Sequence, residues 1–133
     1  MIDAAKVIDT AHNRNTVHFE EVEVLREIQR KIHQQAVDAG WHKKPREVGT
    51  MIALIHSELS EGLEGDRKNL MDDHLPHRKM LEVELADAVI RIFDLGGREK
   101  LDVAGAIAEK LVYNQHRADH KPENRAKEGG KQY

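Results

Sequence analysis

Apolar residues recur every three or four positions in four separate stretches of the chain. That period places them along one face of an α-helix. The stretches run from about 16 to 39, from 45 to between 62 and 65, from 76 to 95, and from 102 to 117. Most of their ends lie at or near glycine or proline, as helix boundaries often do. We therefore predict an all-α fold, a bundle of four to five helices, with Thr16 and Asp102 as N-caps.

The composition fits a protein that buries one face of each helix. Of the 133 residues, 39% are hydrophobic and 34% are charged, and the aromatic residues are only one Trp, two Tyr and two Phe. Few aromatic residues disfavour a sheet protein. Apolar surface is scarce for a chain of this size, so we expect oligomerisation to complete the core. Residues 1–121 are expected to form a single helical domain, and residues 122–133 a flexible polar tail.

Charge and cysteine content argue against several functional classes. The net charge of −3 gives no reason to expect a nucleic-acid partner. The absence of cysteine excludes disulfides and thiolate metal sites. No apolar run approaches the ~20 residues that span a membrane. Residues 1–10 lack the apolar core of a signal peptide. We therefore expect a cytoplasmic protein without a membrane partner. Separately, residues 1–11 are expected to form either a short helix or an arm onto a neighbouring subunit.

Two of the predicted helices carry acidic residues on or beside their apolar stripes. In the second helix, Glu58 lies within the stripe and Glu61 lies at its edge. In the third helix, Glu84 lies within the stripe and Asp87 flanks it. Arg91 and Asp94 continue this flank, where they either orient a metal ligand or form a surface or interhelical ion pair. Residues three apart on a helix are neighbours, so each acidic pair can converge on one ion. The predicted stripes are Val48, Met51, Ile55, Leu59 and Gly62, and Leu81, Leu85, Ala88, Ile92 and Leu95.

Four converging carboxylates indicate a metal site. Buried carboxylates are costly unless they are paired or bound to metal, and no matching lysines share these stripes. Oxygen ligands without cysteine or histidine in the pattern suit Mg²⁺ or Mn²⁺ rather than Zn²⁺. The pairs His116/His120 and His74/His77 lack a third ligand at a recognisable spacing, so no zinc site is predicted.

The fourth predicted helix supplies groups suited to a polyphosphate ligand. Lys110 and Arg117 lie on one side and are expected to contact phosphate oxygens. Asn114 is expected to contact sugar or base, and Tyr113 to pack on the ring. Trp41 is either a base-stacking residue or an anchor in the core or an interface.

The acidic pattern resembles the signature of the MazG-like all-α NTP pyrophosphohydrolases. This signature is E-x-x-E, a spacer, then E-x-x-D. It reads here as Glu58-Leu59-Ser60-Glu61, 22 intervening residues, and Glu84-Leu85-Ala86-Asp87. The segments IHSELSEGLEGDRK, EVELADAVIRIFDLGG and KLVYNQHR extend the resemblance over roughly residues 41–117.

The resemblance implies hydrolysis of an NTP or dNTP to the monophosphate and pyrophosphate by a dimer or tetramer of helical bundles. It implies that Glu58, Glu61, Glu84 and Asp87 bind Mg²⁺. Water would attack the α-phosphorus, activated by one of the carboxylates, Glu58 or Glu61, with Glu61 favoured. The substrate is a standard, damaged or modified nucleotide, or another phosphorylated signal. The alternatives are a non-catalytic nucleotide-binding or interaction module and a di-iron bundle. The latter is disfavoured because no E-x-x-H occurs.

Overall fold

The computed structural model describes residues 16–116, 122–127 and 129. The regular elements of these residues are helices, which confirms the predicted all-α class. They are α1 (Phe19–Asp38), α2 (Val48–Arg67), α3 (Met80–Arg98), α4 (Val103–His116) and the short α5 (Pro122–Arg125), which lies in the predicted tail. Within this described part, no helix combines the length and the apolar character needed to cross a membrane. The predictions for residues 1–11 and for Arg117 lie outside the described residues.

The chain divides into two compact units. The first unit combines Met1–Ile28 with Asp102–Tyr133, and the second unit is Gln29–Leu101. Helix α1 therefore contributes its first half to one unit and its second half to the other. All four predicted metal ligands belong to the second unit, whereas α4 belongs to the first.

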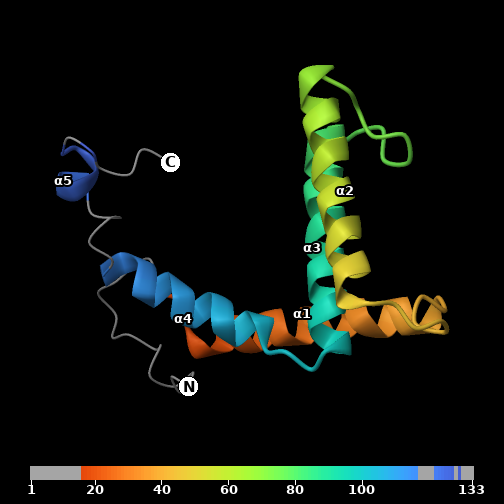
Figure 1. Cartoon of the computed structure of the whole chain (residues 1–133), viewed down its shortest axis with the longest axis horizontal. Coiled ribbons are helices and arrows are strands. Elements are labelled where there is room, and N and C mark those ends of the chain that lie inside the picture. The colour runs from red at the N-terminus through yellow and green to blue at the C-terminus, as the bar shows by residue number, and fades with distance from the viewer. Residues whose placement is uncertain (1–15, 117–121, 128, 130–133) are drawn as a thin grey trace. The chain divides into compact units, whose positions relative to one another are not determined.

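In the first unit, α4 lies alongside the first half of α1 (Figure 1). Val22 of α1 is buried against Ala104 and Ala108 of α4. Because alanine side chains are small, the two helix backbones can approach closely at this point. The partly buried hydrophobic residues packed around this cluster are Val17, Leu25 and Val112.

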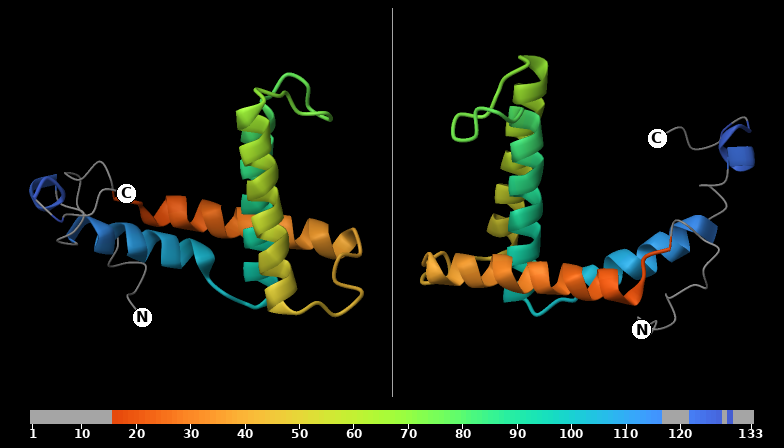
Figure 2. Two further views of the ribbon diagram at one scale, coloured as in Figure 1. Left: turned by 45° about the horizontal axis from the view of Figure 1, so that its top comes forward. Right: turned by 180° about the vertical axis from the view of Figure 1, so that it is seen from behind.

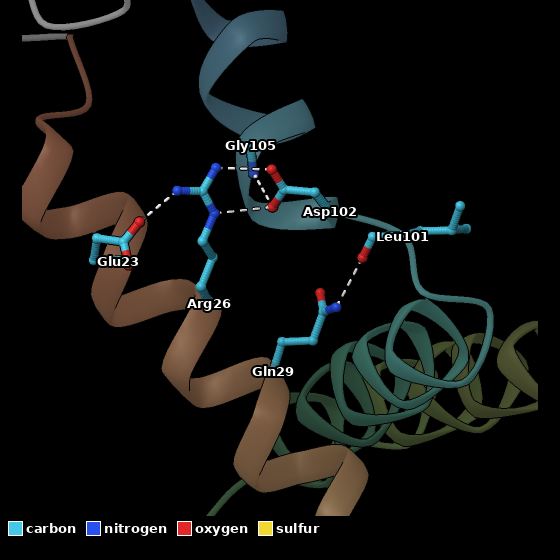
Figure 3. Close-up of polar contacts among 6 residues, drawn as sticks. All are labelled: Glu23, Arg26, Gln29, Leu101, Asp102 and Gly105. Atoms are coloured by element: carbon cyan, nitrogen blue, oxygen red, sulfur yellow. Dashed lines mark hydrogen bonds and ion pairs between the residues drawn. The ribbon is translucent and has the colours of Figure 1, made fainter. Parts of the chain in front are cut away.

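An ion pair links the same two helices (Figure 3). Arg26 of α1 donates from Nη2 to Oδ2 of Asp102 at 2.7 Å and from Nε to Oδ1 at 3.1 Å. Oδ1 also accepts the backbone N–H of Gly105 at 3.0 Å, which confirms Asp102 as the N-cap of α4. The hydrogen bond from Arg26 is the main reason why the pKa of Asp102 is lowered.

The start of α1 differs from the prediction. Thr16 is not the N-cap, because the helix begins three residues later, at Phe19. The carboxylate of Glu21 accepts the backbone N–H of His18 at 3.2 Å instead. This contact satisfies a backbone donor just before the first turn, as the acidic residue of a capping box does.

In the second unit, α2 and α3 run side by side in opposite directions and are joined by a loop at 68–79 (Figure 2). The second half of α1 lies across the end of this pair that is remote from the loop (Figures 1 and 2). The prediction that α2 ends between 62 and 65 is wrong, since the helix continues to Arg67. Gly65 does not stop the helix but allows close packing: a Cβ there would lie 2.7 Å from Cγ of Met80.

The end of α3 shows the same use of glycine. The predicted stop at Gly96-Gly97 is wrong, because the helix continues to Arg98. A Cβ on Gly97 would lie 2.6 Å from Cβ of His33, a distance that real Cβ atoms essentially never show. Glycine at this position therefore lets α1 and α3 cross at short range.

The loop between α2 and α3 has an ordered turn of its own. The buried Asp72 accepts the backbone N–H groups of His74 at 2.9 Å and Leu75 at 2.7 Å through Oδ2. An isolated antiparallel bridge closes the loop. Pro76 lies within this loop, so α3 begins at Met80 and not near Pro76 as predicted.

Candidate functional site

Three of the four predicted metal ligands lie together between α2 and α3. Glu58 of α2 and Glu84 and Asp87 of α3 each offer a carboxylate oxygen, and these oxygens all lie within 4.8 Å of one another. We call these three residues the acidic cluster. Glu58 is 8% exposed and Glu84 is 9% exposed. The antiparallel pairing of the helices therefore places acidic residues 26 positions apart in one small volume, where their charges repel.

Arg91 is the basic partner of Glu58. Its Nε donates to Oε1 of Glu58 at 2.6 Å, and the two side chains are 27% and 11% exposed. The guanidinium carbon of Arg91 also lies 5.6 Å from the ring centroid of Trp41, in a cation–π contact. Arg91 thus connects the acidic cluster to the tryptophan that follows α1.

The two buried glutamates have pKa values shifted in opposite directions. Burial alone would raise the pKa of Glu58, but hydrogen bonds with Arg91, Glu84 and Glu61 lower it. Burial, the hydrogen bond with Glu58 and the nearby negative charges raise the pKa of Glu84 to about 7. A carboxylic acid beside a carboxylate is the expected state of such a pair when no cation is present. Glu84 therefore donates the shared proton, and Glu58 accepts it.

Asp87 completes the cluster, and its charge environment includes a residue of the loop. Burial raises its pKa, and the charges of Glu58 and of Asp72 raise it further. Arg91 opposes this effect. The loop therefore adds a carboxylate to the electrostatic surroundings of the acidic cluster, a contribution that sequence spacing did not reveal.

Glu61, the fourth predicted ligand, lies beside the acidic cluster rather than within it. Its side chain is exposed, and its charge contributes to the raised pKa of Glu84. It lies three residues after Glu58 on α2 and contributes to the lowered pKa of Glu58. Glu61 is therefore the acid of this group that bulk water reaches most readily.

The predicted apolar stripes are only partly buried. On α2, Glu58 is buried together with Met51 and two glycines, while Val48 and Leu59 are 46% and 45% exposed. On α3, Leu85 and Ile92 are 48% and 39% exposed. The helices meet along a narrow contact lined by glycine, alanine and the acids, so the bulky side chains beside it remain uncovered.

A cavity lies beside Arg91, the partner of Glu58. It has a volume of about 300 Å³ and is lined by Trp41, Arg46, Leu54 and Arg91. This volume is at the lower end of the range for small-molecule sites. The lining combines an aromatic face with two guanidinium groups, which suits a planar or anionic ligand.

The other predicted substrate contacts belong to α4, in the first unit. Nζ of Lys110 lies 4.4 Å from the ring centroid of Tyr113. Oδ1 of Asn114 is buried and has no hydrogen-bond partner among the residues that the structure describes. A buried acceptor of this kind is costly, so Asn114 has capacity for a further donor. Arg117, predicted for the same role, is outside the described residues.

A second group of side chains, not indicated by sequence spacing, lies in the second unit. Nδ1 of His33 and Nε2 of His42 lie 2.9 Å and 2.8 Å from Oδ1 of Asp94. Asp94 was predicted either to orient a metal ligand or to form a surface or interhelical ion pair, and it is 3% exposed. The three residues come from α1, the turn after it and α3, so no local motif could have indicated the group.

Comparisons with known proteins find no family model that matches the chain, and no curated protein or solved structure matches it either. The acidic cluster, its arginine partner and the neighbouring cavity are therefore the observations from which a function can be inferred.

Proposed function

We propose that the protein is a Mg²⁺-dependent nucleoside triphosphate pyrophosphohydrolase, which converts an NTP or dNTP to its monophosphate and pyrophosphate. The observation that carries the proposal is the convergence of Glu58, Glu84 and Asp87 from two helices within 4.8 Å. The resemblance of the E-x-x-E and E-x-x-D segments to MazG-like enzymes supplies the reaction class.

The donor set fits a hard divalent cation. All its members are carboxylates, and magnesium prefers oxygen ligands while keeping positions open for water and phosphate. Burial is the largest cause of the raised pKa of Glu84, and the hydrogen bond with Glu58 and the charges of the neighbouring carboxylates add to it. A divalent cation would replace the proton and relieve this repulsion. Manganese has the same ligand preference and is the expected substitute.

The proposed reaction assigns one role to the metal ion and one role each to Glu61 and Arg91. Magnesium would polarise the α-phosphate and acidify the attacking water. Glu61, exposed beside Glu58, takes the proton from that water as its oxygen bonds to the α-phosphorus. The bond from the α-phosphorus to the bridging oxygen then breaks, and pyrophosphate leaves. Arg91 holds Glu58 in place and fixes the orientation of its carboxylate.

The cavity beside the cluster is the proposed place for the rest of the nucleotide. Trp41 offers a face for stacking, and Arg46 offers charge for the β- or γ-phosphate. Lys110, Tyr113, Asn114 and Arg117 are retained as substrate contacts on the basis of the resemblance. Base choice depends on the shape of the occupied pocket.

We also propose a homodimer or homotetramer. Large apolar side chains on α2 and α3 are exposed at helical spacing, and another copy of the chain would cover them. They are Ile52, Leu59, Leu63, Leu85, Val89 and Ile92. A double substitution, Leu59→Glu with Leu85→Glu, is expected to produce monomers in light scattering. Wild-type mass equal to one chain would contradict the assembly.

The enzyme proposal is tested by a product-resolved screen of standard and modified (d)NTPs with Mg²⁺. At least one nucleotide is expected to yield its monophosphate and pyrophosphate, and EDTA is expected to abolish the reaction until Mg²⁺ is restored. Glu61→Gln is expected to lower turnover by about 100-fold or more, as loss of a general base does. The matched control is Asp66→Asn, an exposed acid on the same helix, which should retain wild-type turnover. Binding of nucleotide and Mg²⁺ without turnover would instead indicate a nucleotide-binding module.

A further inference from the structure

The group formed by His33, His42 and Asp94 has the ligand types of a transition-metal site. Each of the three residues offers one ligand atom, and these atoms all lie within 4.8 Å of one another. The two imidazole rings lie close together, with centroids 5.1 Å apart and planes tilted by 54°. Gly97 allows His33 to lie against α3, because any Cβ there would collide with the histidine.

The carboxylate at the centre of this group is deeply buried. The side chain of Asp94 is 4% exposed, and its hydrogen-bonding partners are the two histidines. A buried carboxylate is costly unless positive charge lies beside it, and a metal ion held by both imidazoles would supply that charge. The histidine side chains are 27% and 18% exposed, so the group can be reached from solvent. A divalent cation could enter and neutralise the carboxylate.

We propose that His33, His42 and Asp94 bind a divalent transition-metal ion, with Zn²⁺ the best match, and leave its fourth position open. Two imidazole nitrogens with one carboxylate oxygen form a recognised ligand set for zinc. Tetrahedral zinc with ligands at ~2.0–2.2 Å separates its ligand atoms by roughly 3.3 Å. The distances from Oδ1 of Asp94 to Nδ1 of His33, 2.9 Å, and to Nε2 of His42, 2.8 Å, therefore need to increase by only a few tenths of an ångström.

This site is distinct from the acidic cluster in ligand chemistry and in position. The acidic cluster offers only oxygen, whereas this group offers nitrogen and is poorly suited to magnesium. Asp94 lies seven residues after Asp87 on α3, about 10 Å further along the helix axis. The ion would join α1, the turn that carries Trp41, and α3, and so stabilise the second unit.

The test uses full-length protein stripped of metal by chelation. Cobalt(II), a spectroscopic substitute for zinc, is expected to give visible absorption bands of tetrahedral coordination with one ion per chain, and added Zn²⁺ should abolish them. Excess Mg²⁺ should leave the bands unchanged, because it competes for the acidic cluster only. His42→Gln and Asp94→Asn should each lose the bands, while His56→Gln, an exposed histidine on α2, should keep them.

A measurement on the wild-type protein removes any dependence on variants that fail to fold. In nitrogen-15 spectra of the histidine rings, Zn²⁺ should shift Nδ1 of His33 and Nε2 of His42. Absence of cobalt bands, displacement by Mg²⁺, or shifts confined to other histidines would overturn the proposal. The three residues would then form a hydrogen-bond network without an ion.

Discussion

Nε of Arg91 lies 2.6 Å from Oε1 of Glu58 and joins α3 to α2 at the acidic cluster. The carboxylate is almost buried, so this hydrogen bond stabilises a charge that the surroundings would otherwise disfavour. The pair also explains why Glu58 is the ionised member of the glutamate pair, with Glu84 holding the proton. The two helices are thus held by the same groups that are proposed to bind the cation.

Replacing Arg91 should destabilise the metal-free protein more than replacing an exposed arginine. Arg91→Met leaves Glu58 without its cation and is expected to lower the free energy of unfolding by about 1–3 kcal/mol. Arg78 is the matched control, because it pairs with Glu82 on the surface. Arg78→Met should cost less than ~0.5 kcal/mol. Urea denaturation in EDTA measures both, and equal losses would contradict the account.

The stability of the metal-free protein should fall as pH rises from about 5 to 7. The pKa of Glu84 is raised from 4.5 to about 7 in the folded state. Between these values the folded protein retains a proton that the unfolded chain has released, so raising the pH favours unfolding. Mg²⁺ should restore stability at the upper end, since it replaces the proton.

The control for this pH effect is Glu84→Gln, which cannot ionise. The difference in unfolding free energy between wild type and variant should depend on pH only across this window. The unfolding free energy of the wild type minus that of the variant should therefore fall from pH 5 to 7. If this difference stays constant or rises, Glu84 is not protonated in the metal-free site.

Two glycine-to-alanine substitutions should have opposite effects on stability. A Cβ on Gly105 would lie 2.8 Å from Cγ of Asp102 and 3.0 Å from Nη2 of Arg26, so Gly105→Ala should displace the ion pair that joins α1 and α4. A Cβ on Gly49, in α2, meets nothing within 4 Å. Gly49→Ala should therefore stabilise the protein by up to ~1 kcal/mol through helix propensity alone. Thermal denaturation should give a lower melting temperature for Gly105→Ala and a higher one for Gly49→Ala. A higher melting temperature for Gly105→Ala would contradict the packing of α1 against α4.

Helical period was enough to predict the fold class and the approximate place of the four long helices. It also predicted that Glu58 and Glu84 are buried, because both lie within their apolar stripes. Helix ends were less predictable. Gly65 and Gly97 read as stops in the sequence, yet each faces a side chain at a helix contact. A glycine required for close packing and a glycine that ends a helix have the same local sequence signal.

The features that could not be predicted depend on contacts between residues far apart in the sequence. An interhelical ion pair was one of the alternatives predicted for Arg91, but its partner Glu58, 33 positions away, was not identified. The group around Asp94 spans three elements. Such contacts depend on how helices cross, which periodicity along one helix does not specify. Periodicity also did not predict how much of each apolar stripe is covered. Leu59 on α2 and Leu85 on α3 lie on the predicted stripes, yet both side chains are exposed.

The site of bond cleavage is the central claim, and it is tested most directly by hydrolysis in water labelled with heavy oxygen. The label is expected to enter the nucleoside monophosphate, and unlabelled pyrophosphate is expected to be released. Asp87→Asn should lower the rate by about 100-fold or more, because losing a metal ligand should cost at least as much as losing a residue that supports one. Label in pyrophosphate, release of orthophosphate, or full activity of Asp87→Asn would contradict it.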